Sequence, residues 1–148
     1  MFVSHLESAI DGSRFEAGRV WTVHQGRPLW VRYGLDKVRS AVRPDDFSSR
    51  PPSLWRYREL LPLPAGVEPV TLGEGMTPLL PCRRLGKEMG LDRLLVKDES
   101  QLPTGSFKSR GMTMSVSMAR HFGQKRLAIP TAGNAGGALA AYAARAGM

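Results

Sequence analysis

The chain has 148 residues, with 21 lysines and arginines against 13 aspartates and glutamates, and its formal net charge at pH 7 is +8. This length supports one modest domain and is too short for a two-domain enzyme. Hydrophobic residues make up 42% of the chain and charged residues 23%, which excludes a disordered polar chain. The longest apolar run, residues 138–144, falls far below the roughly 20 residues of a membrane span.

The chain's single cysteine, Cys82, excludes an internal disulfide, a paired-cysteine redox motif and a cysteine-rich zinc site. Three scattered histidines give no reason to expect a metal centre. The first residues lack the basic start and apolar stretch of a signal peptide. We therefore expect a soluble protein of a reducing compartment, the cytoplasm, without a membrane partner.

The positive charge is dispersed, with no like-charge run longer than two residues and no basic tail, so we expect no nucleic-acid partner. Beyond Glu99 the chain has no acidic residue. The basic residues of that stretch are Lys108, Arg110, Arg120, Lys125, Arg126 and Arg145. This half favours a bound phosphate or carboxylate, although an ordinary basic surface gives the same pattern.

Residues 1–42 predict a β-rich N-terminal segment, with a hairpin that pairs residues 20–23 and 29–33 around the turn Gln25-Gly26. Residues 43–70 predict a linker and a short helix. Three prolines and an Asp-Asp pair disfavour regular structure in residues 43–53. Ser53 is then expected to cap a helix over residues 54–61, before extended chain and turns in residues 71–81.

From residue 91 onward the pattern alternates between strand and helix, and residues 71–148 are expected to begin a catalytic α/β domain. Strands are predicted at residues 94–97 and 127–130, and helices over residues 106–121 and 136–146. Their expected buried faces are Phe107, Gly111, Met114 and Met118 in the first helix, and Leu139, Tyr142, Ala143 and Ala146 in the second. Gly123 and Gly147 are expected to end them.

Repeated strand–helix units predict an α/β fold in which a parallel sheet is joined by crossover helices. So few strands leave exposed edges and little core. We therefore expect the chain to be a truncated, N-terminal portion of a larger α/β enzyme.

One candidate site lies in residues 102–111, at the start of the first predicted helix. Ser106 is expected to cap the helix, so Lys108 lies in its first turn, where a cation faces the positive end of the helix dipole. Arg110 adds like-charge repulsion. Both effects favour the neutral amine, the form that attacks an aldehyde to make a Schiff base. A surface lysine that extends past the helix start fits the same residues.

A second candidate site lies in residues 131–137, between a predicted strand and a helix, where α/β enzymes bind ligands. Its three glycines allow close backbone approach, and the start of the helix offers N–H groups to an anion. The Asn134 side chain can both donate and accept hydrogen bonds. A plain turn into the helix, with no ligand, is the alternative.

The segments PTGSFKSRG and PTAGNAGGALAAYAARAG, with GEGMTPLL and VKDES upstream, resemble the fold-type II pyridoxal phosphate enzymes of the tryptophan synthase β-like fold. Within them the chain is similar to the threonine synthase family. The match covers residues 72–148, and LWRYRELLPL before it is similar too. Some relatives carry a zinc-ribbon-like element near the N-terminus, where this chain has Ser8, Asp11 and His24, so the resemblance implies no metal here.

The resemblance implies that Lys108 forms a Schiff base with pyridoxal 5′-phosphate and then acts as the catalytic acid/base group. It implies that Asn134 hydrogen-bonds the phenolic oxygen of the cofactor and that Phe107 lies beside the cofactor ring. The residues implied to hold the substrate carboxylate through backbone N–H groups are Thr131, Ala132, Gly133 and Asn134. Thr104, Ser106 and Arg110 are weaker candidates for the neighbourhood of a phosphate. For Lys97, a structural ion pair with Asp98 or Glu99 is as plausible an expectation as a role in the site.

The implied reaction belongs to threonine biosynthesis and converts O-phospho-L-homoserine and water to L-threonine and phosphate, a lyase reaction. Ser109 follows the lysine where many threonine synthases have aspartate, which leaves the subgroup open. The family's glycine-rich loop for the cofactor phosphate and its pyridine-nitrogen contact do not occur by Met148. We therefore expect the 148-residue chain alone to be inactive.

Two alternatives remain at this point. One is a related fold-type II enzyme, either a threonine dehydratase or a cysteine synthase-like protein. The other is a catalytically inactive, truncated remnant. A small-molecule substrate is expected for the enzyme, and a homodimer is left open.

Overall fold

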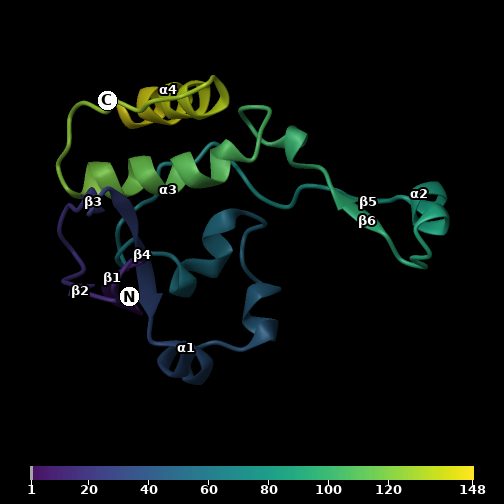
Figure 1. Ribbon diagram of the computed structural model, residues 1–148, viewed down its shortest axis with the longest axis horizontal. Coiled ribbons are helices and arrows are strands. Elements are labelled where there is room, and N and C mark those ends of the chain that lie inside the picture. The colour runs from purple at the N-terminus through teal and green to yellow at the C-terminus, as the bar shows by residue number, and fades with distance from the viewer. Residues whose placement is uncertain (1) are drawn as a thin grey trace.

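The computed structural model describes residues 2–148 and contains two antiparallel sheets, a pair of long helices and several short ones (Figure 1). In chain order the elements are β1 (Val3–Ser8), β2 (Arg14–Phe15), β3 (Val23–His24), β4 (Arg27–Tyr33), α1 (Leu35–Ala41), the 3₁₀ helices η1 (Pro44–Phe47) and η2 (Leu54–Leu60), β5 (Leu79–Pro81), α2 (Arg83–Glu88), β6 (Leu95–Lys97), the 3₁₀ helix η3 (Glu99–Gln101), α3 (Lys108–His121) and α4 (Asn134–Ala146). Within residues 2–148 we find no helix with the length and hydrophobicity needed to cross a membrane.

The N-terminal sheet has the strand order β2-β1-β4-β3, and every pair in it is antiparallel. The predicted hairpin turn is confirmed, because Gln25 and Gly26 both have positive φ, as a two-residue turn of type I′ requires. The hairpin is shorter than expected, since β3 contains only two residues. The main partner of β4 is β1, with Leu6 opposite Val31, and the sequence did not single out β1 as a strand.

The prediction of a parallel sheet was wrong for residues 2–148. The predicted strand at 94–97 forms as β6, but it pairs antiparallel with β5, where Leu80 lies opposite Val96. Residues 127–130 form no strand. A strand needs a hydrogen-bonded neighbour, and the described chain places none beside this segment. The β5–β6 ribbon and α2 instead form an arm that extends away from the rest of the chain (Figure 1).

Helices α3 and α4 pack against each other, and their amino ends lie at the same end of the pair (Figure 1). Residues 122–133 between them run back along the pair, so the two helices point in the same direction. The predicted terminators are confirmed, because Gly123 and Gly147 have φ values of 73° and 70°. The helix starts differ from prediction by two residues each: α3 begins at Lys108, and α4 begins at Asn134.

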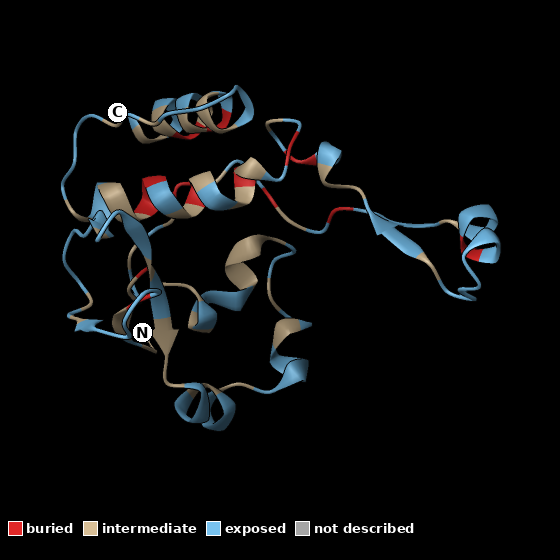
Figure 2. Cartoon of the chain, in the orientation of Figure 1, coloured by how far each residue is buried: buried red, intermediate tan, exposed pale blue. Residues whose placement is uncertain are grey.

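The predicted buried face of α3 was wrong. Phe107 is 58% exposed and Gly111 is exposed. The side chains buried from α3 are Ser109, Thr113, Val116 and Ser117. This face meets the backbone of Val70 and the buried carboxylate of Glu74. On α4, Tyr142 is buried as predicted, with Leu139 and Ala146 packed against the core of Val70, Val116 and Tyr142. Figure 2 shows that buried residues concentrate along this pair, while the arm is mostly exposed.

Residues 43–61 contain more structure than expected. The 3₁₀ helix η1 forms at Pro44–Phe47 within the predicted linker, and α1 forms just before it. Ser53 makes no capping side-chain hydrogen bond, and η2 is a 3₁₀ helix broken at Tyr57 rather than an α-helix. A two-fold hydrogen bond from the Arg50 guanidinium to the Glu59 carboxylate, at 2.7 and 2.9 Å, holds this stretch together instead.

Candidate cofactor and substrate site

Lys108 is the first residue of α3, and its side chain is partly exposed. Its Nζ lies 4.4 Å from the centroid of the Phe107 ring, a cation–π distance. Phe107, not Ser106, occupies the position before the helix and has helical φ and ψ. The predicted Ser106 cap was therefore wrong. The Ser106 Oγ is buried and has no hydrogen-bond partner in the described chain.

Arg110 forms a tight ion pair with Glu99. Its Nε lies 2.5 Å and its Nη2 2.9 Å from the Glu99 carboxylate oxygens, and the Thr77 hydroxyl donates to Glu99 at 2.5 Å. The hydrogen bond from Arg110 lowers the pKa of Glu99 to about 2, against a smaller opposing effect of burial. The paired carboxylate offsets the charge of Arg110, so the predicted repulsion of Lys108 is largely compensated. The same pairing engages the guanidinium that was a candidate for phosphate.

Lys97 and Thr104, also considered above as site residues, have hydrogen-bond partners within the fold. Lys97 donates to the Thr77 carbonyl oxygen at 3.0 Å, which corrects the expected ion pair with Asp98 or Glu99. The Thr104 hydroxyl lies 2.6 Å from the buried Ser109 hydroxyl. The first contact ties β6 to the segment before β5, and the second holds the loop that leads into α3.

The Glu99–Arg110 pair predicts a loss of stability in acid. The carboxyl has an ordinary pKa of 4.5 and a folded-state pKa of about 2. Its contribution is therefore fully present above about pH 4.5 and is lost as the pH falls through 2. Urea unfolding of the native protein between pH 5 and pH 2 should show a shallower decline for Arg110→Met than for the parent, because the variant removes the largest cause of the lowered Glu99 pKa and leaves only the Thr77 hydrogen bond. Parallel declines would contradict this role.

In residues 131–137, Thr131 caps α4. Its Oγ1 accepts hydrogen bonds from the backbone N–H groups of Gly133 and Gly136, each at 3.0 Å. Gly133 has a φ of 142°, a conformation that glycine adopts without strain. The four predicted carboxylate-binding residues, Thr131, Ala132, Gly133 and Asn134, are all exposed. The Gly133 N–H is thus already used by Thr131, while the Asn134 side chain stands at the open start of the helix.

Because Thr131 caps α4, alanine substitutions at two neighbouring glycines should differ in their effect on stability. A methyl group on Gly136 would lie 2.7 Å from the Thr131 Cγ2 and would force that side chain out of its capping position. A methyl group on Gly137 would meet nothing within 4 Å. We expect Gly137→Ala to be more stable than Gly136→Ala by about 1 kcal/mol, the effect of one lost cap. Urea denaturation of both variants measures the difference, and equal stabilities would argue against the cap.

Sequence reasoning missed Glu74, the most connected polar side chain near the two helices. Its carboxylate is fully buried. The groups that donate hydrogen bonds to it are Trp55 Nε1 (3.0 Å), Thr71 Oγ1 (2.9 Å), Leu72 N (3.0 Å), Thr113 Oγ1 (2.8 Å) and Tyr142 Oη (2.6 Å). Burial has the largest single effect and raises the pKa of Glu74, but the hydrogen bonds to the carboxylate, led by those from Tyr142 and Leu72, together lower it below the ordinary value. The available signal was a charged residue between two glycines in GEGMTPLL.

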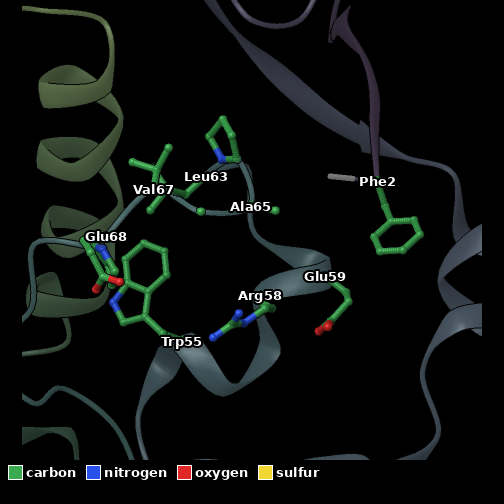
Figure 3. A pocket seen from close by; sticks show the side chains of 11 residues that line it. Phe2, Trp55, Arg58, Glu59, Leu63, Ala65, Val67 and Glu68 are labelled. Atoms are coloured by element: carbon green, nitrogen blue, oxygen red, sulfur yellow. The ribbon is translucent and has the colours of Figure 1, made fainter.

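Two cavities lie away from the amino ends of α3 and α4. The first, of about 230 Å³, is bounded by η2 and residues 63–69, with Trp55, Arg58 and Glu59 on its wall (Figure 3). The second, of about 550 Å³, lies between the N-terminal sheet and α3 and includes Met114 and Met118. Neither is lined by Lys108 or Asn134. Within residues 2–148 we find no group of three His, Cys, Asp or Glu side chains suited to a metal ion.

The positions of α3 and α4 bring two of the candidate residues, Lys108 and Asn134, to the same end of the helix pair. Lys108 and Asn134 are the first residues of α3 and α4, whose amino ends lie together (Figure 1). A sequence model of one protein family, described as pyridoxal-phosphate dependent enzyme, matches residues 70–148, more than half of the chain. The chain belongs to the pyridoxal-phosphate dependent enzymes. Both helices and Glu74 lie inside the matched range.

Three curated relatives of this pyridoxal-phosphate dependent enzyme are each named threonine synthase. The threonine synthase of Methanocaldococcus jannaschii is 39% identical over 128 residues, covering 86% of this chain and 32% of that protein. The threonine synthase of Methanosarcina acetivorans is 48% identical over 97 residues, covering 66% of this chain and 24% of that protein. That of Halalkalibacterium halodurans is 46% identical over 101 residues, covering 65% and 28%. The chain therefore spans about a third or less of the length of these relatives.

The residues at the amino ends of α3 and α4 fit pyridoxal phosphate. The Lys108 amine is partly exposed, and the salt bridges of residues 2–148 do not include it. At Gly133 and Gly137 the space that a Cβ would take is open, so a flat ligand can approach the backbone closely. The adjacent Asn134 amide can donate or accept a hydrogen bond.

Proposed function

We propose that this chain supplies the lysine-bearing part of a fold-type II threonine synthase, which converts O-phospho-L-homoserine and water to L-threonine and phosphate. The observation that carries the proposal is the placement of Lys108 and Asn134 at the adjoining amino ends of two helices that point in the same direction. The threonine synthases of three organisms, which match 86%, 66% and 65% of this chain, support the choice of reaction.

Within this proposal, the Lys108 amine binds the cofactor aldehyde and later holds and moves protons at the substrate carbons. When bound, pyridoxal phosphate supplies an electron sink for those carbons. Phe107 is exposed beside Lys108 and is free to lie against the cofactor ring. Asn134 orients the ring by a hydrogen bond. Residues 131–134 present backbone N–H groups to the substrate carboxylate.

The Gly133 N–H is the exception in that set, because Thr131 accepts from it. Binding of a carboxylate there requires Thr131 to release this hydrogen bond. The hydroxyl hydrogen of Thr131, which neither capping hydrogen bond uses, can donate to the same carboxylate. Thr131 thereby exchanges an internal partner for a ligand.

We further propose three parts of the chain: residues 1–42 as a β-rich N-terminal segment, residues 43–70 as a linker with a short helix, and residues 71–148 as the start of the catalytic domain. Met1 lies outside the described residues. The separate N-terminal sheet supports the first part, and the Glu74-centred packing of α3 and α4 supports the third. A cytoplasmic location and a homodimer belong to the same proposal.

The test compares substrates of the native protein, meaning the protein as its source cells make it, because the 148-residue chain alone is expected to be inactive. Pyridoxal phosphate is added to each assay. Release of inorganic phosphate and formation of threonine from O-phospho-L-homoserine are expected. Threonine and O-acetylserine, offered separately, should give little product. Faster turnover of threonine or O-acetylserine would move the chain to another reaction of the same family, and turnover of none would contradict the proposal.

A further inference from the structure

Glu74 is a buried carboxylate that the proposed chemistry does not use. It is fully enclosed, and all five hydrogen bonds to it come from neutral donors. Removing a carboxylate from water is costly, so each of these donors matters to the ionised form. The arrangement holds a charge at one fixed point of the fold.

The two oxygens of Glu74 bind different helices. Oε1 lies 2.8 Å from the hydroxyl of Thr113 on α3, about 1.4 turns beyond Lys108, and this hydroxyl shares its one hydrogen between Glu74 and the Val70 carbonyl oxygen, at 2.6 Å. Oε2 accepts from the Tyr142 hydroxyl on α4, at 2.6 Å. The carboxylate therefore bridges the helix that begins with Lys108 and the helix that begins with Asn134.

Stability alone does not require a charge at this point. Val70, Val116 and Tyr142 already form an apolar core between the helices, and well-packed apolar side chains often stabilise a buried site as well as an ion does. Hydrogen bonds to a charged acceptor differ from apolar contacts in being directional and short. They fix the rotation and the axial position of a helix, which an apolar contact leaves looser.

We infer that Glu74 is a positioning residue that sets the placement of the amino end of α3 relative to that of α4, and so the placement of Lys108 relative to Asn134. The roles of those two residues rest on the proposed function. The bridge itself does not, because it is a property of the fold.

The test compares Tyr142→Phe with Trp55→Phe in the native protein. Each variant removes one donor to Glu74 and keeps an aromatic ring. Trp55 lies on η2, which carries none of the proposed site residues. Its Nε1 also lies 3.2 Å from the Thr113 Oγ1, but within residues 2–148 Trp55 has no hydrogen bond to α4 and so does not join the two helices, which makes it the matched control. Both variants should lower Tm by similar amounts, because each loses one hydrogen bond to the same carboxylate.

The readout that separates them is the distance between the helices. Spin labels on Gly111→Cys and Gly137→Cys, in a background otherwise free of cysteine, report it by dipolar electron paramagnetic resonance. Both positions are exposed and have open space for a side chain. The distance distribution should be narrow in the parent and in Trp55→Phe, and shifted or broadened in Tyr142→Phe. Equal distributions in all three, or equal changes in both variants, would overturn the inference.

Cofactor binding gives a second readout. In equilibrium dialysis, Tyr142→Phe should weaken pyridoxal phosphate binding by about tenfold, while Trp55→Phe should change it less than about twofold. If the parent does not bind pyridoxal phosphate, the proposed function fails and the spin-label comparison alone decides this inference. If Tyr142→Phe does not fold, Thr113→Val takes its place, and Thr113→Ser should restore the parent distance because it keeps the hydroxyl.

Discussion

Lys108→Ala is expected to abolish threonine formation by the native protein. Loss of the acid/base group alone costs about 10²–10⁴-fold in rate, and loss of covalent cofactor attachment adds to it. Lys108→Arg should be equally inactive, because an arginine keeps the positive charge but its guanidinium does not deprotonate to attack an aldehyde. Phosphate release and threonine formation, followed with saturating cofactor, measure the effect.

The control for Lys108 is another lysine of the same half of the chain. Lys125 is exposed and lies in the connection between α3 and α4, away from both helix starts. Lys125→Ala should retain the parent rate within about twofold, since isolated surface substitutions are close to neutral. The Lys108 variants should also keep the parent free energy of unfolding within about 0.5 kcal/mol, because the side chain has no ion-pair partner within residues 2–148. A Lys108 variant that folds and retains activity would contradict the assigned role.

Gly75→Ala is expected to destabilise the protein strongly, because Gly75 packs against the backbone of Ser53. A Cβ at this position would lie 2.7 Å from the Ser53 Cα and 2.9 Å from its carbonyl carbon, and both are backbone atoms that cannot rotate away. The φ of Gly75 is also +151°, which side-chain-bearing residues rarely adopt. Overpacking and backbone strain together predict a loss of roughly 2–5 kcal/mol. The effect reaches Glu74, because the Leu54 N–H donates to the Glu74 carbonyl oxygen at 2.8 Å across the same contact.

The matched control for Gly75 is Gly111, an exposed glycine inside α3. A Cβ there would meet nothing within 4 Å, so Gly111→Ala should stabilise the chain by roughly 0.5–1 kcal/mol through backbone entropy and helix propensity. Urea unfolding of both variants gives the two free energies. A Gly75→Ala variant as stable as the parent would show that residues 53 and 75 do not approach each other as described.

The helix pair was the part of the fold that local sequence signals could predict. Gly123 and Gly147 marked the ends of α3 and α4, because glycine readily takes the left-handed conformation that ends a helix. The starts were less predictable. Ser106 has the residue type of a cap, yet Thr131 is the residue that caps a helix here, from three positions before Asn134. Capping depends on where the preceding loop turns, which residue type alone does not specify.

The buried face of α3 could not be predicted from apolar spacing. The spacing of Phe107, Met114 and Met118 suits a buried stripe, but the buried positions are largely serine and threonine. They are buried because each has a polar partner: Thr113 lies against Glu74, and Ser117 accepts from the Val70 N–H, partners 39 and 47 residues away in the sequence. The parallel sheet failed for a related reason, since pairing depends on a neighbouring strand and not on the segment itself.

The candidate site was predictable to the extent that motifs carry it. The two loops were identified from PTGSFKSRG and TAGNAGG, and both lie within residues 70–148, the range that the family model matches. Two features of the site could not be predicted from the motifs: the ion pair of Arg110 with Glu99, and the hydrogen bond from the Gly133 N–H to Thr131. Each depends on side-chain contacts between segments or across a turn.

The most direct test of the central claim is to locate the cofactor on the chain. The native protein is incubated with pyridoxal phosphate, reduced with borohydride, digested, and its peptides are mapped by mass spectrometry. We expect a single pyridoxyl group on the peptide that contains Lys108, and none on the corresponding peptide of Lys108→Ala. A pyridoxyl group on Lys97 or Lys125 in place of Lys108, or none on any lysine, would contradict it.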